Sequence, residues 1–183
     1  MFRMPKLIPV PGQNMFSDGP AAAEAARIMS DVWKNEETRF GNLNTRAVAV
    51  LSATSIIATI LGFFSKNLFD TSSAGFQGSA RFTAACGIFV ALGLLVATAG
   101  VVVFGCLLPS HRAIFGNNDL TKGEDKTAQE IDNTAFNEYQ GIYVILANRS
   151  AIKAYWLTWA YVTFFLAVLA AAVTTAILVN AID

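Results

Sequence analysis

The side chains that most often carry chemistry are few in this sequence and stand far apart. The chain of 183 residues contains one histidine, His111, and two cysteines, Cys86 and Cys106. The two cysteines lie 20 residues apart in one uncharged stretch, which separates them by about 30 Å along a helix and excludes a disulfide between them. His111 follows Pro109 and precedes Arg112, where a basic pair anchors a membrane span more often than it binds a metal. These residues predict neither a zinc site nor a disulfide framework.

A second group with potential chemistry is acidic. Five carboxylates lie within 15 residues: Glu124, Asp125, Glu130, Asp132 and Glu138. Their spacing lacks the loop pattern of an EF-hand, and a solvated helix face is the better interpretation. The sequence also lacks a phosphate-cradling glycine loop, a nucleophile elbow and a metalloprotease helix. We predict that the chain is not an enzyme and holds no metal or cofactor.

The elements that must position any site are strongly apolar. Apolar residues make up 54% of the chain and charged residues 14%, against roughly 45–50% and about 25% in soluble domains. Residues 47–65, 82–108 and 154–182 contain no Asp, Glu, Lys, Arg or His. About 20 such residues cross the hydrocarbon core of a bilayer as a helix, in which every backbone group is satisfied. We predict an all-α integral membrane protein with three transmembrane helices, because the polar remainder is too short to cover these stretches in water.

Two polar segments lead into these spans. Apolar residues recur at helical spacing between residues 21 and 46 and again between residues 131 and 148, and no proline follows before the next span. Two of the transmembrane helices should therefore extend into cytoplasmic amphipathic helices, which run parallel and pack within one subunit or between subunits. The predicted order is a proline-rich arm at 1–19, an amphipathic helix at 20–46, a first span at 47–69, an outer loop at 70–81, a second span at 82–108, a cytoplasmic loop and helix at 109–153, and a third span at 154–182.

The distribution of cations predicts the orientation in the membrane. Of the 13 Lys and Arg residues, six precede the first span, two lie between the first and second spans, five lie in 109–153 and none follows the third span. By the positive-inside tendency, the N-terminus and the long middle segment face the cytoplasm, and the C-terminus faces the other side. Aromatic residues support an interface at the start of the third span: Tyr155, Trp156, Trp159 and Tyr161. Asp and Glu also number 13, so no basic excess favours nucleic-acid binding.

The interior of the spans favours packing over transport. The spans contain no ionisable residue in their middle, which disfavours a carrier or a channel with a charged pathway. Small residues recur four positions apart, a spacing that lets helices approach closely: Gly87 with Ala91, Gly93 with Ala97, and Ala167 with Ala171.

The order of these parts resembles the transmembrane effector domain of Pycsar-type and related bacterial anti-phage systems. Short motifs carry the resemblance over about residues 24–180: Glu37-Thr38-Arg39-Phe40 and Asn44-Thr45-Arg46-Ala47 before the first span, Pro109-Ser110-His111-Arg112 after the second, and Asn148-Arg149-Ser150-Ala151-Ile152-Lys153 before the third. Asn44 departs from the pattern, since the family often has an acidic residue there.

The resemblance implies a bacterial inner-membrane effector that impairs membrane integrity on a nucleotide or similar signal and acts as a homo-oligomer. A phosphate-bearing ligand would contact the cations beside the membrane: Arg39, Arg46, Arg112, Arg149 and Lys153. Each of these is also an ordinary juxtamembrane anchor. The alternative is a structural or accessory subunit of a larger membrane complex, in which the arm at 1–19 docks on unlike membrane subunits.

Overall fold

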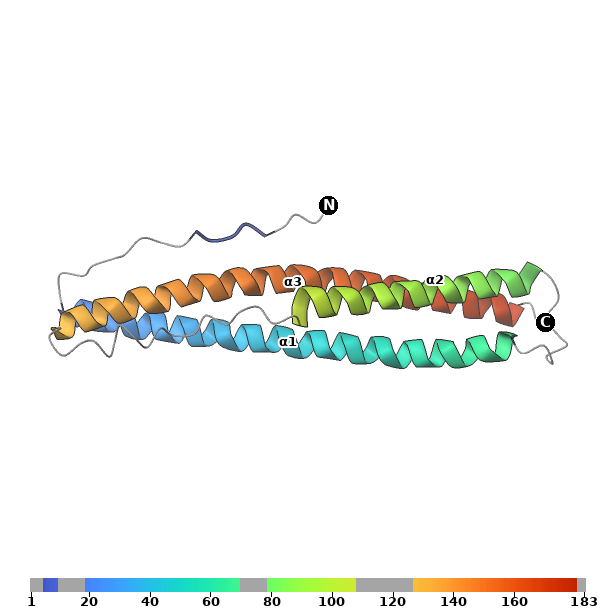
Figure 1. The fold of residues 1–183 in the computed structure, drawn as a ribbon, viewed down its shortest axis with the longest axis horizontal. Helices are drawn as coiled ribbons and strands as arrows, with labels where there is room; N and C mark the ends of the chain where they lie inside the picture. Colours follow the sequence, from blue (N-terminus) through green and yellow to red (C-terminus); the bar gives the residue numbers. More distant parts are fainter. Residues whose placement is uncertain (1–4, 10–18, 70–78, 108–126, 181–183) are drawn as a thin grey trace. The chain divides into compact units, whose positions relative to one another are not determined.

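Three long helices make up almost all of the chain that the computed structural model describes, which is residues 5–9, 19–69, 79–107 and 127–180. They are α1 at Gly19–Phe69, α2 at Ser79–Val102 and α3 at Ala128–Asn180 (Figure 1). The turn after α2, η1 at Val103–Leu107, is a π-helix. Each long helix is long and apolar enough to cross a membrane. The predicted all-α fold with three apolar spans is confirmed.

The helices extend beyond the apolar stretches that predicted them. α1 has 51 residues and α3 has 53, so each continues without a break from a polar segment into an apolar one. α2 begins at Ser79, inside the segment expected to be an outer loop, because helical hydrogen bonding does not stop where the apolar residues end. Most of that loop, the turn expected at 116–119 and most of the arm at 1–19 lie outside the described residues.

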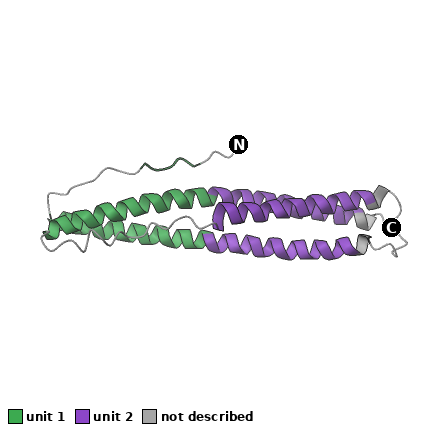
Figure 2. Ribbon diagram, viewed as in Figure 1, with its two compact units in different colours: residues 1–43, 109–154 green, residues 44–108, 155–183 purple. Residues whose placement is uncertain are grey.

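The chain divides into two compact units (Figure 2). Unit 1 comprises residues 1–43 and 109–154, and unit 2 comprises residues 44–108 and 155–183. α1 and α3 each contribute their N-terminal part to unit 1 and their C-terminal part to unit 2, whereas α2 belongs to unit 2 alone.

In unit 2, α2 packs antiparallel to α3. Three pairs mark the register: Gly87 with Thr174, Thr98 with Thr163, and Gly105 with Trp156. The two residue numbers of each pair add to the same value, so the register does not slip between Gly87 and Gly105. These positions are 18 residues apart, which is about five helical turns. Both glycines therefore lie on the same face of α2.

Small residues and leucines fill the inside of unit 2. A buried cluster joins all three helices and consists of Leu61 from α1, Ala91 and Leu95 from α2, and Ala167 from α3. The expectation that small residues such as Ala91 and Ala167 pack helices together is confirmed. Close backbone approach supplies the packing in such a bundle, because large side chains would hold the helices apart.

The largest apolar side chains of unit 2 point outward. Phe89, Val96 and Phe104 of α2 are 65%, 74% and 74% exposed, and Phe165 of α3 is 67% exposed. An apolar surface of this extent is unusual on a soluble protein and typical of a surface that another apolar phase covers. Lipid tails are such a phase, because they are as apolar as the side chains themselves.

In unit 1, α1 and α3 run parallel and contact each other within one chain. The Trp33 and Tyr139 rings stack with centroids 6.1 Å apart and planes at 30°, and Phe40 meets Lys153 about two turns further along both helices. The predicted packing of the two amphipathic helices is thus intramolecular in this structure.

A capping box starts α3. The Thr127 backbone N–H donates to Glu130 Oε2 at 2.9 Å, and the Glu130 N–H donates to Thr127 Oγ1 at 3.4 Å. The two residues thereby satisfy each other's exposed backbone donors at the helix end.

Candidate functional site

The five cations predicted to contact a ligand fall in different parts of the chain. Arg39, Arg149 and Lys153 belong to unit 1, Arg46 belongs to unit 2, and Arg112 lies outside the described residues. Arg39 and Arg46 are exposed, Arg149 is half-buried and Lys153 is buried. The part of the predicted site that the structure describes most fully is therefore in unit 1, on α1 and α3.

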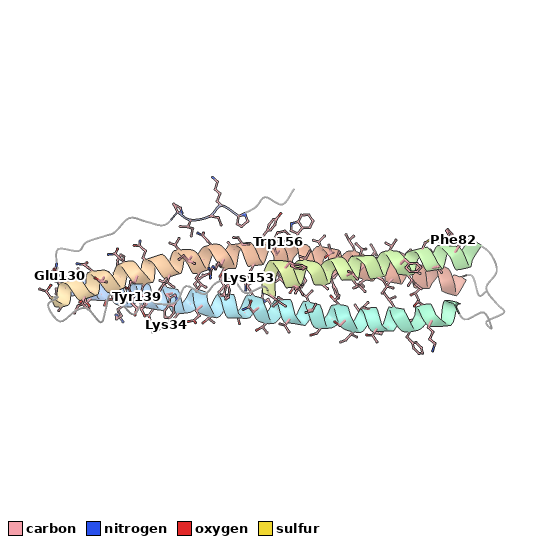
Figure 3. The ribbon with its side chains drawn as sticks, viewed as in Figure 1. Lys34, Phe82, Glu130, Tyr139, Lys153 and Trp156 are labelled. Carbon is pink, nitrogen blue, oxygen red and sulfur yellow. The ribbon has the colours of Figure 1, made fainter. Side chains whose placement is uncertain are left out.

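Lys153 differs from the other cations because it is only 8% exposed (Figure 3). Its Nζ lies 3.9 Å from the centroid of the Phe40 ring. A ring attracts a cation over its face through its quadrupole, by about 2 kcal/mol or more once both groups are desolvated. A lysine beside a span usually extends its ammonium group toward water or headgroups. Here an aromatic face of α1 takes that place, and the contact ties α1 to α3.

Arg39 is paired with an acid one turn earlier on α1. Its Nη1 lies 3.4 Å from Glu36 Oε1 and 3.5 Å from Oε2, and the Arg39 side chain is 59% exposed. An ion pair this long at an exposed position contributes roughly 0–1 kcal/mol. The guanidinium is therefore held loosely and can exchange Glu36 for another anion at little cost.

Two buried polar atoms of α3 make no hydrogen bond with the described residues: Ser150 Oγ and Glu138 Oε2. Ser150 is fully buried and lies one turn before Lys153. The interpretation of Glu138 as part of a solvated face is wrong for this oxygen, because the helical period turns position 138 partly inward. No group of three potential metal ligands occurs among the described residues.

Asn148 of α3 holds the extended segment at residues 5–9. The Ile8 backbone N–H donates to Asn148 Oδ1 at 2.6 Å, and Asn148 Nδ2 donates to the Ile8 carbonyl oxygen at 2.8 Å. A side-chain amide carries the same donor and acceptor as a peptide group, so one residue satisfies both backbone groups of Ile8. The sequence offers no signal for this pairing, because Asn148 and Ile8 are 140 residues apart.

Unit 2 contains one hydrogen bond between side chains of different helices among those described. Thr98 Oγ1 lies 2.9 Å from Thr163 Oγ1, and Thr163 Oγ1 lies 3.0 Å from the Trp159 carbonyl oxygen. Gly87 lets the same two helices approach closely, since a Cβ built on it would lie 3.1 Å from Cβ of Thr174. Gly93 has nothing within 4 Å of such an atom, so its expected role in close packing within the chain is wrong.

The outer face of α1 carries an exposed ion pair. Arg27 Nη2 lies 2.7 Å from Glu24 Oε1, and Arg27 Nε lies 2.9 Å from Glu24 Oε2. The hydrogen bond from the Arg27 guanidinium lowers the pKa of the Glu24 carboxyl. This bidentate geometry marks the turn as a water-facing surface.

No protein-family model, no curated protein and no solved structure matches this chain.

Proposed function

We propose that the chain is a multi-pass protein of a bacterial inner membrane that impairs the membrane on a nucleotide or similar signal, acting as a homo-oligomer. The observation that carries the proposal is the continuity of α1 and α3, each of which runs from the polar unit 1 into the apolar unit 2. Consecutive turns of a helix are hydrogen-bonded to each other. A shift or rotation of either helix in unit 1 is therefore passed on to its span.

Membrane insertion is supported by the outer surface of unit 2. Its exposed phenylalanines and valines, such as Phe89 and Val96, would lie against acyl chains. Tyr155, Trp156 and Trp159 form a cluster of edge-to-face rings at the start of the third span, and such rings prefer the headgroup level. With the excess of cations before the first and third spans, this places unit 1 in the cytoplasm and the C-terminus outside.

Unit 1 is the proposed receiver of the signal. Arg39, Arg149 and Lys153 are the described cations that a phosphate would contact there, and Ser150 Oγ offers a further donor one turn from Lys153. A charge-assisted hydrogen bond to a phosphate oxygen competes with the cation–π contact that Lys153 makes with Phe40. The loss of that contact would favour a different arrangement of α1 and α3 and so shift the population of the spans.

Several copies are needed for membrane impairment. The inside of unit 2 is closed by Leu95, Thr98 and Ala167, each at most 1% exposed, so one chain encloses no water-filled path at this level. A lesion in the bilayer therefore requires spans of different copies to rearrange together.

The experiment is a measurement of membrane potential in bacteria that express the chain from an inducible promoter. We expect a voltage-sensitive dye to report depolarisation when a nucleotide signal is supplied. The double variant Arg39→Gln/Arg149→Gln should insert normally but lose the response, whereas Gly93→Ala should keep it. A potential that is unaffected by wild-type expression with every nucleotide tested contradicts the proposal.

A different outcome would favour the accessory-subunit alternative. In that case the purified chain would be stable only together with unlike subunits, and its N-terminal residues would contact them rather than Asn148. Crosslinking from a photoreactive group at Lys6 in intact cells separates the two functions. The effector proposal expects crosslinks within the chain or between copies of it.

A further inference from the structure

The segment at residues 5–9 is fixed to α3 by its backbone alone. Both polar backbone groups of Ile8 are bonded to the Asn148 amide, at 2.6 and 2.8 Å. Pairing through one side-chain amide sets the position of an extended segment but makes no use of its side chains. The side chains of the segment are therefore available to another surface.

These side chains are apolar and basic, and they face away from unit 1. Leu7 is 56% exposed and Ile8 is 45% exposed, and the neighbouring Lys6 is exposed as well. Burial of a leucine or isoleucine is worth roughly 1.5–3 kcal/mol, yet unit 1 covers neither of them fully. Two adjacent apolar side chains beside a cation form the pattern of a segment that lies at a membrane surface.

The position of Asn148 on α3 places the segment near the proposed bilayer surface. Asn148 lies seven residues before Tyr155 on the same helix, which is about 10 Å along the axis. Tyr155 and Trp156 are the first rings of the aromatic cluster proposed to mark the interface. The headgroup layer adds roughly 5–8 Å on each side of the hydrocarbon core. Ile8 is therefore held at the outer edge of that layer.

We propose that residues 5–9 form a membrane-surface anchor on the cytoplasmic side. Leu7 and Ile8 enter the headgroup layer, Lys6 contacts the phosphates of anionic lipids, and Asn148 sets the depth of the segment. The proposal rests on the membrane insertion proposed above. Its consequence is that the N-terminal segment and α3 bind the same leaflet as one element.

Fluorescence quenching tests the anchor in vesicles of phosphatidylethanolamine and phosphatidylglycerol. The native cysteines are first replaced (Cys86→Ala, Cys106→Ala), and a bimane label is then placed at Leu7→Cys. As an aqueous control, Asn35→Cys is labelled, because Asn35 is an exposed α1 residue 12 residues before the first span. We expect lipids with a nitroxide on the headgroup to quench the label at position 7 several-fold more than the label at position 35.

A second pair of variants separates the anchor from membrane insertion itself. A label at Phe165→Cys should be quenched by lipids with a nitroxide deep in the acyl chain. Asn148→Leu should reduce headgroup quenching at position 7 to the level of position 35 and leave quenching at position 165 unchanged. Equal quenching at positions 7 and 35, or no effect of Asn148→Leu, overturns the anchor. If position 165 escapes the acyl-chain quencher, membrane insertion and the proposed function fail with it.

Discussion

Gly105 and Trp156 lie so close together that α2 has no room for a side chain at this position. A Cβ built on Gly105 would lie 2.6 Å from Cγ and 2.7 Å from Cβ of Trp156. Non-bonded carbon atoms do not approach to this distance, because their optimal separation is about 3.5–4.0 Å. The contact falls in the π-helical turn η1, and π-turns often mark functional positions within helices.

Gly105→Ala should destabilise unit 2 by about 1–3 kcal/mol, because either the indole or α2 must move to admit the methyl group. Gly100→Ala is the matched control, since nothing lies within 4 Å of its Cβ position and alanine favours a helix over glycine. Thermal unfolding in detergent, followed by tryptophan fluorescence, measures both. Equal melting temperatures for the two variants would contradict the close contact.

The Thr98–Thr163 hydrogen bond should show a measurable coupling energy. A double-mutant cycle with Thr98→Val and Thr163→Val is expected to give about 0.6 kcal/mol, and at most about 1.7 kcal/mol, as for other hydrogen bonds between membrane helices. The hydroxyl of Thr59 donates to Ser55 within its own helix. A parallel cycle of Thr59→Val with Thr163→Val should therefore give no coupling, and coupling of similar size in both cycles would speak against the assignment.

Phe40→Leu should weaken the contact between α1 and α3 in unit 1, because leucine keeps the apolar volume but removes the ring face beneath Lys153. Hydrogen exchange should become faster in residues 36–43 and 148–154, whereas Phe40→Trp should keep the wild-type protection. The effect of Phe40→Leu should shrink in a Lys153→Met background, since no cation is then left to lose its partner. An unchanged effect in that background would assign the protection to packing alone.

Thr127→Ala should fray the first turn of α3, at a cost of about 1 kcal/mol, because it removes the side-chain oxygen of the capping box. Faster hydrogen exchange is expected at Gln129, Glu130 and Ile131. Thr134→Ala serves as the control, since its hydroxyl donates only to a carbonyl of its own helix. The cap is not needed if both variants exchange at the wild-type rate.

The Glu24 carboxyl should titrate below its ordinary pKa of 4.5, because the Arg27 guanidinium hydrogen-bonds to its charged form. A lowered pKa in the folded state means that the pair stabilises the fold above the ordinary pKa. That contribution is lost as the pH falls through the folded value. Carbon-detected NMR titration of Glu24 measures the pKa, and Arg27→Gln should return it toward 4.5. An identical pKa in the variant would rule out the hydrogen bond as the cause.

Several features of this protein were predictable from local sequence. The uncharged stretches predicted three spans because lipid excludes charge at any position of a long run. The continuity of α1 and α3 followed from the absence of proline, since no residue interrupts the hydrogen bonds of the backbone. The Thr127–Glu130 spacing is also a local signal, although the interpretation of Glu130 as part of a solvated acidic face overlooked it.

The sequence by itself thus determined which segments are helical and which of them suit a bilayer, because these properties depend on neighbours along the chain. Only the tertiary structure decided which glycine and which cation have a partner. Gly87 and Gly93 have similar local sequences, yet only Gly87 meets another helix. Lys153 and Arg149 lie one turn apart, yet only Lys153 lies over an aromatic ring. Such differences arise from the rotation of one helix against another, and residues distant in the sequence set that rotation through packing.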